Sequence, residues 1–136
     1  MNGVANGLYG GDLPNQINTP WIDFSEQSTI VGWSSYTTKI IRYKVVGKMV
    51  FIDYFIQGTS NSTNTSFTVP IQSSPTQGYS ATVITVTNNG TTGFGKSALN
   101  ASTTIVNFAN GITAAFAGSW TASGTKLIIG QFFYEI

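Results

Sequence analysis

Two segments of this 136-residue chain place large apolar side chains on both faces of what must be a β-strand. On one face of residues 49–57 stand Val50, Ile52, Tyr54 and Ile56. The other face carries Met49, Phe51, Asp53, Phe55 and Gln57. A strand with one face in water alternates apolar and polar residues. A chain this short has few elements to cover a second apolar face, so the pattern indicates that another copy of the protein covers it.

The second such segment is residues 127–136. One face reads Ile128, Gly130, Phe132, Tyr134 and Ile136, and the other reads Leu127, Ile129, Gln131, Phe133 and Glu135. We assign the face that contains Val50 and Tyr54 to the core of the domain. The predicted subunit interface consists of Phe51, Asp53, Phe55, Gln131 and Phe133.

Two polar residues, Asp53 and Gln131, interrupt these otherwise apolar faces. A buried carboxylate has to be paired or hydrogen-bonded. One hypothesis is that both residues meet a neighbouring subunit and fix its register. The alternative is that Asp53 pairs with a cation of its own hairpin, such as Arg42.

The composition is that of one globular domain with an unusually uncharged surface. Hydrophobic residues make up 41% of the chain and aromatic residues 13%, which excludes a disordered protein. Charged residues make up only 8%, against the usual level of about 25%, and the net charge is +1. Such a chain has no long-range field for a polyanion, so nucleic-acid binding is not expected. With no cysteine, disulfides and thiol chemistry are excluded.

Residues 1–20 differ from the rest, because glycine, proline and asparagine recur there without any period. We expect an extended arm, linker or shaft end at 1–20, which Tyr9, Leu13 and Ile17 could dock onto a head domain at 21–136. The first residues have no basic and apolar regions, so no signal peptide is expected. No apolar run reaches the roughly 20 residues of a membrane-spanning helix, so no membrane insertion is expected.

From Trp21 onward the chain has the signature of an all-β sandwich or barrel: β-branched and aromatic residues predominate, and turn signals recur about every 8–12 residues. We predict strands at 29–34, 37–46, 48–57, 65–70, 79–87, 92–98, 103–109, 112–117 and 126–135. Gly47 should close a tight hairpin, and Asn110-Gly111 should form a type I′ turn between 103–109 and 112–117. Further turns are expected at Asn89-Gly90 and Ser123-Gly124, and polar loops at 58–64 and 72–78.

The residues of most enzyme mechanisms are missing. The chain has no histidine, which removes histidine acid–base catalysis, the common nucleophile systems and imidazole metal sites. Its five carboxylates are Asp12, Asp23, Glu26, Asp53 and Glu135. Only Asp23 and Glu26 lie close in sequence, and solvation of a loop explains them better than a glycosidase pair. We therefore expect no enzyme, no metal and no cofactor.

Binding is the remaining class of function. Sugars are recognised by an aromatic face together with amide and hydroxyl groups, and this chain is rich in all three. The candidate ligand-binding residues are Tyr79, Phe94, Trp120, Asn61 and Asn64. For each aromatic residue the competing interpretation is packing in the core or at an edge, and for the asparagines it is simple solvation.

Seven short stretches resemble the C-terminal head domains of bacteriophage tail fibres and tail-associated structural proteins. They are 19–25 (TPWIDFS), 32–35 (GWSS), 41–44 (IRYK), 46–48 (VGK), 58–63 (GTSNST), 120–126 (WTASGTK) and 130–135 (GQFFYE). The resemblance implies a compact, jelly-roll-like β-sandwich, in most cases a homotrimer, at the tip of a fibre. It also implies a virion protein that is made in the host cytoplasm, without a signal peptide, and that contacts the host surface.

The leading hypothesis is therefore a fibre-tip domain that binds a receptor on the host cell, most simply a glycan. A second hypothesis is a purely structural cap that holds three fibre chains in register and has no ligand. A third is a small glycan-active enzyme, which the missing histidine and scarce carboxylates disfavour.

Overall fold

The computed structural model describes residues 17–77 and 79–136, and every regular element in this part of the chain is a strand. The strands are β1 (Ile22–Asp23), β2 (Ile30–Val31), β3 (Trp33–Val46), β4 (Met49–Ser60), β5 (Ser66–Thr68), β6 (Tyr79–Asn88), β7 (Thr91–Asn100), β8 (Ile105–Ala109) and β9 (Thr125–Glu135). The expected all-β class is confirmed.

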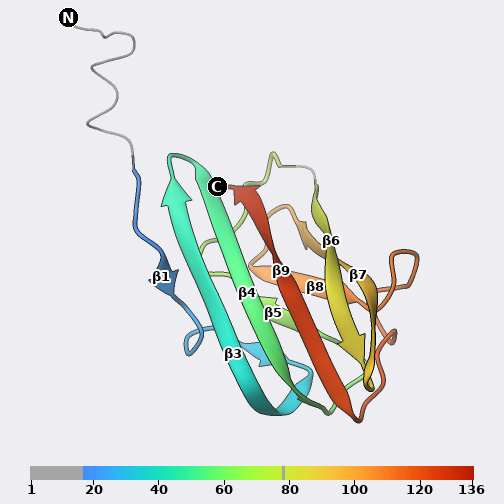
Figure 1. The fold of residues 1–136 in the computed structure, drawn as a ribbon. Helices are drawn as coiled ribbons and strands as arrows, with labels where there is room; N and C mark the ends of the chain where they lie inside the picture. The colour runs from blue at the N-terminus through green and yellow to red at the C-terminus, as the bar shows by residue number, and fades with distance from the viewer. Residues whose placement is uncertain (1–16, 78) are drawn as a thin grey trace, which may run out of the picture.

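All nine strands belong to one antiparallel sheet, in the order β1-β3-β4-β9-β6-β7-β8-β5-β2. The sheet curls, so that β3, β4, β9 and β6 form a front layer while β5 and β8 cross behind it (Figure 1). The two layers of the expected sandwich are therefore two parts of a single curled sheet.

The core lies between these two layers, on the face of β4 and β9 that the alternation predicts. Its front wall on β4 is Val50, Ile52, Tyr54 and Ile56, each at most 1% exposed. The Tyr54 ring is 5.3 Å from the ring of Phe67 on β5 and 5.4 Å from that of Phe108 on β8, both edge-on. Burial of one such side chain stabilises a fold by about 1.5–3 kcal/mol, so this aromatic contact holds the layers together. The core assignment is confirmed.

A single glycine carries the chain from one edge of the sheet to the other. β2 is the last strand at one edge and β3 lies next to the opposite edge, with only Gly32 between them. Gly32 has φ +125°, and a Cβ there would lie 2.9 Å from the Asn64 carbonyl oxygen and 2.9 Å from Lys126 Nζ. Glycine is required here by both backbone conformation and space. This crossing splits the strand that we expected at 29–34.

Two of the predicted turns are confirmed. Gly47, with φ +58°, closes the tight hairpin of β3 and β4. At the β6–β7 turn, Asn89 and Gly90 have φ +49° and +83°, which are the two positive values of a type I′ turn. The predicted loop at 58–64 starts later than expected, because β4 continues to Ser60.

The predicted hairpin at Asn110-Gly111 is wrong. Of the described non-glycine residues, only Asn89 and Ser102 have positive φ, so Asn110 does not adopt the type I′ conformation. β8 pairs with β7 on one side and with β5 on the other, which leaves it no free edge for a strand at 112–117. Residues 110–124 form an irregular connection to β9 instead.

Both ends of the described chain flank the Gly47 turn. The Gly47 N–H donates to the Ile17 carbonyl, and the Ile136 N–H donates to the Lys48 carbonyl. Residues 17–20 lie along the end of β3, and the Thr19 N–H donates to the Val45 carbonyl. Tyr9 and Leu13, which we expected to dock the arm, lie outside the described residues, and the domain boundary at 20 stays a prediction.

Candidate functional site

The outward face of the front layer presents three rows of side chains that run across β3, β4 and β9. The register of these strands aligns them as Ile40–Phe55–Ile129, Arg42–Asp53–Gln131 and Lys44–Phe51–Phe133. We call this surface the outer face. It joins all five residues of the predicted interface, and Phe133 on it is 59% exposed. The rings of Phe51 and Phe133 stand 5.9 Å apart. Two mainly apolar rows, one with isoleucines at both ends and one with a pair of phenylalanines, thus lie on either side of a polar row.

The polar row of the outer face satisfies its own charges. Arg42 Nε donates to Asp53 Oδ2 at 2.6 Å, and Gln131 Nε2 donates to Asp53 Oδ1 at 3.3 Å. The alternative in which Asp53 pairs with Arg42 is confirmed. Because both carboxylate oxygens have partners in the same chain, the outer face holds no unpaired carboxylate that would oppose its burial.

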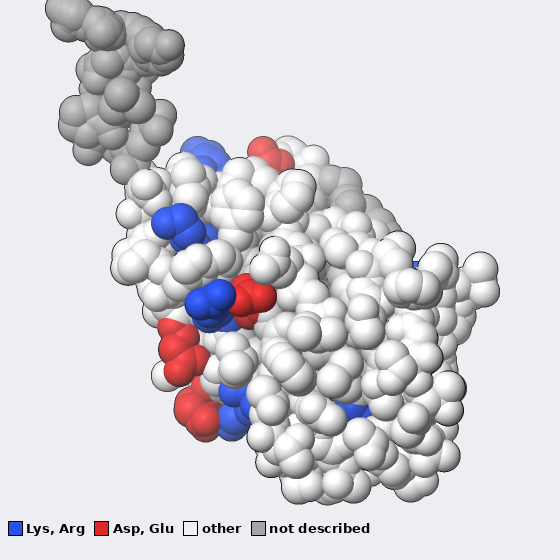
Figure 2. Space-filling view, in the orientation of Figure 1, with Lys and Arg blue, Asp and Glu red and all other residues white. Residues whose placement is uncertain are grey.

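The few charged groups gather at one side of this view of the molecule. Figure 2 shows blue and red atoms mainly over β1 and β3, while the rest of the face is almost free of them. At this side the Arg42 guanidinium lies 4.8 Å from the centre of the Trp21 ring. Trp21 is 42% exposed, so the stacked pair forms the charged border of the outer face.

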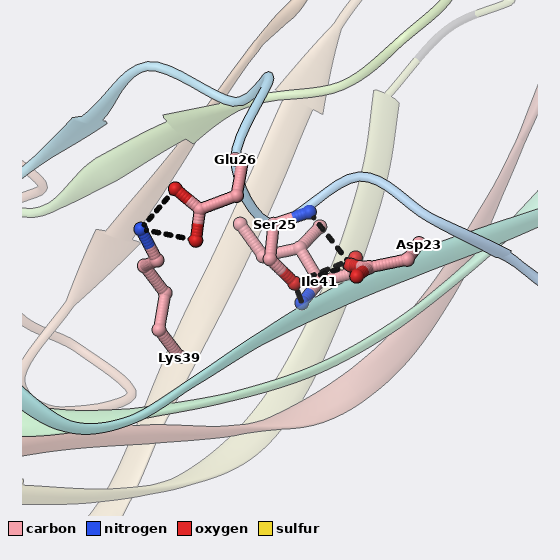
Figure 3. A network of polar contacts seen from close by, with 5 residues as sticks. All are labelled: Asp23, Ser25, Glu26, Lys39 and Ile41. Carbon is pink, nitrogen blue, oxygen red and sulfur yellow. Dashed lines mark hydrogen bonds and ion pairs between the residues drawn. The ribbon is translucent and has the colours of Figure 1, made fainter.

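The only carboxylates close in sequence hold the turn after β1 against β3 (Figure 3). Asp23 Oδ1 accepts hydrogen bonds from the Ser25 hydroxyl at 2.6 Å and from the Ser25 N–H at 2.9 Å. These two bonds lower the pKa of the Asp23 carboxyl below its usual value. Glu26 forms an ion pair of 2.9 Å with Lys39, and the Ser25 hydroxyl accepts from the Ile41 N–H. Each carboxylate has its own partner within the chain, and the lowered pKa of Asp23 is the opposite of what a general acid requires.

A second surface lies at the end of the sheet opposite the Gly47 turn. It consists of the loop 61–65, the β6–β7 turn at 88–91 and the loop 119–124, and we call it the rim. β4 spans twelve residues between the two ends, which at about 3.3 Å per residue separates them by roughly 36 Å. All rim residues are uncharged, and Ser, Thr, Asn and Gly predominate.

Hydrogen bonds connect the three segments of the rim. The Trp120 N–H donates to the Thr63 carbonyl at 3.2 Å. The Thr121 N–H donates to Asn88 Oδ1 at 2.9 Å, and Asn88 Nδ2 donates back to Thr121 Oγ1 at 3.2 Å. The Gly118 N–H donates to Asn64 Oδ1 at 2.9 Å. The rim is therefore an organised surface rather than three independent loops.

A buried cation supports the rim from below. Lys126 is fully buried, and its ammonium donates to the carbonyls of Ser62 and Asn64 at 3.0 and 3.4 Å. It lies 5.3 Å from the ring of Trp33 and 5.1 Å from that of Trp120. Burial lowers the pKa of Lys126 to about 8. Our sequence analysis missed this residue, although the alternation of 126–134 already places it on the core face.

The five predicted ligand residues do not form one site. Asn61 and Asn64 lie exposed on the rim. Phe94 is 67% exposed but pairs with Thr85, which pairs with Ile129, so it extends the Ile40–Phe55–Ile129 row of the outer face. Tyr79 begins β6 near the other end of the sheet, and its side chain lies outside the described part.

The prediction that Trp120 is a ligand platform is wrong, and the competing core interpretation holds. Its ring is 3% exposed, and its indole N–H donates to the Phe108 carbonyl at 3.0 Å. Trp33 is equally buried, and its indole N–H donates to the Lys126 carbonyl at 3.1 Å. Both rings pack in the core and against Lys126, so neither has an exposed face that could stack on a bound sugar.

Beside the β6–β7 turn the rim is hollowed. The hollow measures about 300 Å³ and is lined by Asn88, Asn89, Thr91, Thr92, Gly93, Asn110 and Thr121. Every lining side chain carries an amide or a hydroxyl, and none carries a charge. Such groups can exchange hydrogen bonds with a neutral polar molecule but cannot form an ion pair.

No family model, curated protein or solved structure matches the chain. Within residues 17–77 and 79–136, no three His, Cys, Asp or Glu side chains lie close enough to share a metal ion. The same part of the chain contains no helix that is long and apolar enough to span a membrane. Functional inference for this protein therefore rests on its own residues and contacts.

Proposed function

We propose that this chain is the head domain of a bacteriophage tail fibre, which assembles as a homotrimer and binds a neutral host-surface glycan. The single observation that carries the proposal is that Ile17 and Ile136, the ends of the described part, lie at the opposite end of the sheet from the rim. The described chain enters and leaves beside the Gly47 turn, whereas the uncharged rim lies at the far end of β4 and β9. A fibre attached at the Gly47 end would present the rim to the cell.

Self-association is supported by the outer face. Monomeric soluble proteins rarely expose a continuous apolar patch of more than a few hundred Å². Here Ile40, Phe51 and Phe133 are 45%, 36% and 59% exposed, and the charged row between them is already neutralised. Burying this face against other copies would remove apolar rings from water without leaving a carboxylate buried and unpaired. In a trimer, three rims that bind weakly to the same surface would gain avidity, which raises the overall affinity by about 10²–10⁴ over that of one site.

The proposal is one of binding rather than of a reaction, and it includes the jelly-roll-like head that the sequence resemblance implies. It also includes a virion location, reached from the host cytoplasm without a signal peptide. The rim supports a glycan ligand because its hydroxyl and amide groups match the hydroxyls of a neutral sugar. A polyanionic ligand is disfavoured, since no rim side chain is charged and Lys126 is covered.

The experiment combines mass measurement with a panel of bacterial surface polysaccharides. We expect light scattering to give three copies for the parent and one for Phe133→Ser, whereas Ile105→Ser on β8 should stay trimeric. Ile105 is 47% exposed and Phe133 59%, so this control removes a similarly exposed apolar side chain from another surface. If parent and Phe133→Ser are both single copies, the assembly through the outer face is refuted.

A structural cap is the second candidate, and one observation favours it. The side-chain oxygens of Asn64 and Asn88 already accept hydrogen bonds from backbone N–H groups of the same chain, so they serve the structure of the rim. The polysaccharide panel separates the two candidates. An intact trimer that binds no polysaccharide would establish the cap, whereas binding to a neutral polysaccharide would establish the receptor-binding head.

A further inference from the structure

Gly93 on β7 has no structural reason to be glycine. Glycine weakens the interior of a strand, and where it occurs it marks a bulge, a tight bend or the close approach of another group. At Gly95 a Cβ would meet the Ala109 carbonyl oxygen, and at Gly130 it would meet Ile84 and Tyr54. Packing explains both of those glycines.

None of these explanations applies to Gly93. Its φ is not in the left-handed region, and no heavy atom lies within 4 Å of the position that its Cβ would occupy. The pairing of β6 with β7 runs without a shift through Val86 and Gly93, so the strand has no bulge there. The absence of a side chain at Gly93 leaves space free, and this space is at the border of the rim hollow.

The walls of this hollow are held in place before any ligand arrives. Asn88 is fixed by two hydrogen bonds with Thr121. Asn110 is fixed by Ser119, whose hydroxyl accepts from the Asn110 N–H at 3.0 Å and whose carbonyl accepts from Asn110 Nδ2 at 3.3 Å. Asn89 and Thr91 stand exposed at the mouth. Fixed polar walls lower the cost of ordering a site on binding.

We infer that Gly93 keeps open a binding site for a single neutral sugar ring in the hollow between the β6–β7 turn and Asn110. The inference rests on the proposed function for the class of ligand and adds the position of the site. A hollow of about 300 Å³ lies at the small end of ligand pockets, which suits one ring rather than a longer chain. Its lining offers hydrogen bonds in several directions and no charge, which matches a ring of hydroxyls.

The test compares Gly93→Val with Ala81→Val. Valine at 93 fills the hollow from a strand position where it meets nothing, so it should leave the melting temperature unchanged or raise it. Ala81 is exposed on β6 and borders a different hollow, near Gln77 and Glu135, which makes it the matched control. A third variant, Thr91→Val, keeps the shape of the side chain and removes one hydroxyl at the mouth.

The probes are the methyl glycosides of glucose, galactose, mannose and N-acetylglucosamine, followed by amide chemical shifts at residues 88–93. We expect at least one glycoside to shift these amides in the parent and in Ala81→Val. Gly93→Val should weaken that binding at least tenfold, and Thr91→Val several-fold.

Three results would overturn the inference. One is a parent in which no neutral glycoside shifts residues 88–93, and another is binding of glucuronic acid alone. The third is unchanged binding in Gly93→Val. If the parent binds a neutral polysaccharide but residues 88–93 do not respond, the site is wrong and the proposed function stands. If the parent binds no polysaccharide at all, the proposed function fails with it.

Discussion

The outer face and the rim place their polar and apolar groups in opposite ways. The outer face exposes aromatic and aliphatic side chains, and its ion pair lies in the row Arg42–Asp53–Gln131, with Lys44 at the end of the row of Phe51 and Phe133. The rim exposes hydroxyls and amides, and the cation beneath it, Lys126, is buried beside two tryptophan rings. In both places the chain itself supplies the partners of the charge. The difference indicates that the outer face is suited to burial and the rim to contact with a polar ligand.

The largest effect is expected where the chain passes beneath the rim. Gly32→Ala forces a left-handed φ on alanine and brings its Cβ to 2.9 Å from the Asn64 carbonyl oxygen. We expect the free energy of unfolding to fall by about 3 kcal/mol or more, measured by urea denaturation. Gly118→Ala is the control, because Gly118 has φ +77° in open space and should cost only about 1 kcal/mol. Equal losses would mean that the rim has room to move at Gly32.

An intermediate effect is expected from the buried cation of the rim. The pKa of Lys126 is about 8 in the folded chain, against an ordinary value of 10.5 for an exposed lysine, so the folded state loses the proton at lower pH than the unfolded state. Between these two values the unfolded state binds more protons, and raising the pH therefore stabilises the fold. We expect the free energy of unfolding to gain about 2 kcal/mol from this group between pH 7 and pH 9.5.

Urea denaturation across that pH range measures the gain, and Lys126→Met should abolish it. Lys96→Met is the control, because Lys96 also lies over an aromatic ring, 4.9 Å from the centre of Phe116, but on another part of the sheet. In this control the rise should persist. A rise that survives in Lys126→Met would show that another group causes it.

The smallest effect is expected on the outer face. The Arg42 and Asp53 side chains are 46% and 23% exposed, so water screens their ion pair. In the Phe133→Ser background, which should be a single copy, a double-mutant cycle with Arg42→Met and Asp53→Asn should give a coupling of about 0.5 kcal/mol at low salt, and less at high salt. In the parent background, the proposed assembly would bury the pair, so the coupling should become insensitive to salt and rise to about 2 kcal/mol. Equal, salt-sensitive couplings in both backgrounds would contradict burial of the outer face.

Where local alternation decided the structure, prediction from sequence succeeded. The β3–β4 hairpin, its turn at Gly47, the core face of β4 and the grouping of Phe51 with Phe133 all follow from side-chain period and turn chemistry. These features depend on residues that are neighbours in sequence or in the same register. Strand faces alternate strictly, so one correct assignment places every other residue of the strand.

Prediction failed where distant segments compete for the same place. Asn110-Gly111 has the residues of a hairpin turn, but both edges of β8 are occupied by β5 and β7. Trp120 has the position of a loop aromatic, but its ring completes the core above Lys126. Neither the pairing of both edges of β8 nor the burial of the Trp120 ring can be predicted from local residues, because each depends on how the sheet curls.

The sequence alone settled the all-β class, the two-faced strands and the shortage of groups for catalysis, because alternation and residue inventory are local properties. Tertiary structure decided that the rim is one surface, that Lys126 lies beneath it and that Gly93 borders a hollow. Those relations join residues up to 64 positions apart, such as Lys126 and Ser62. They arise only when curling of the sheet brings the ends of β4, β6 and β9 together.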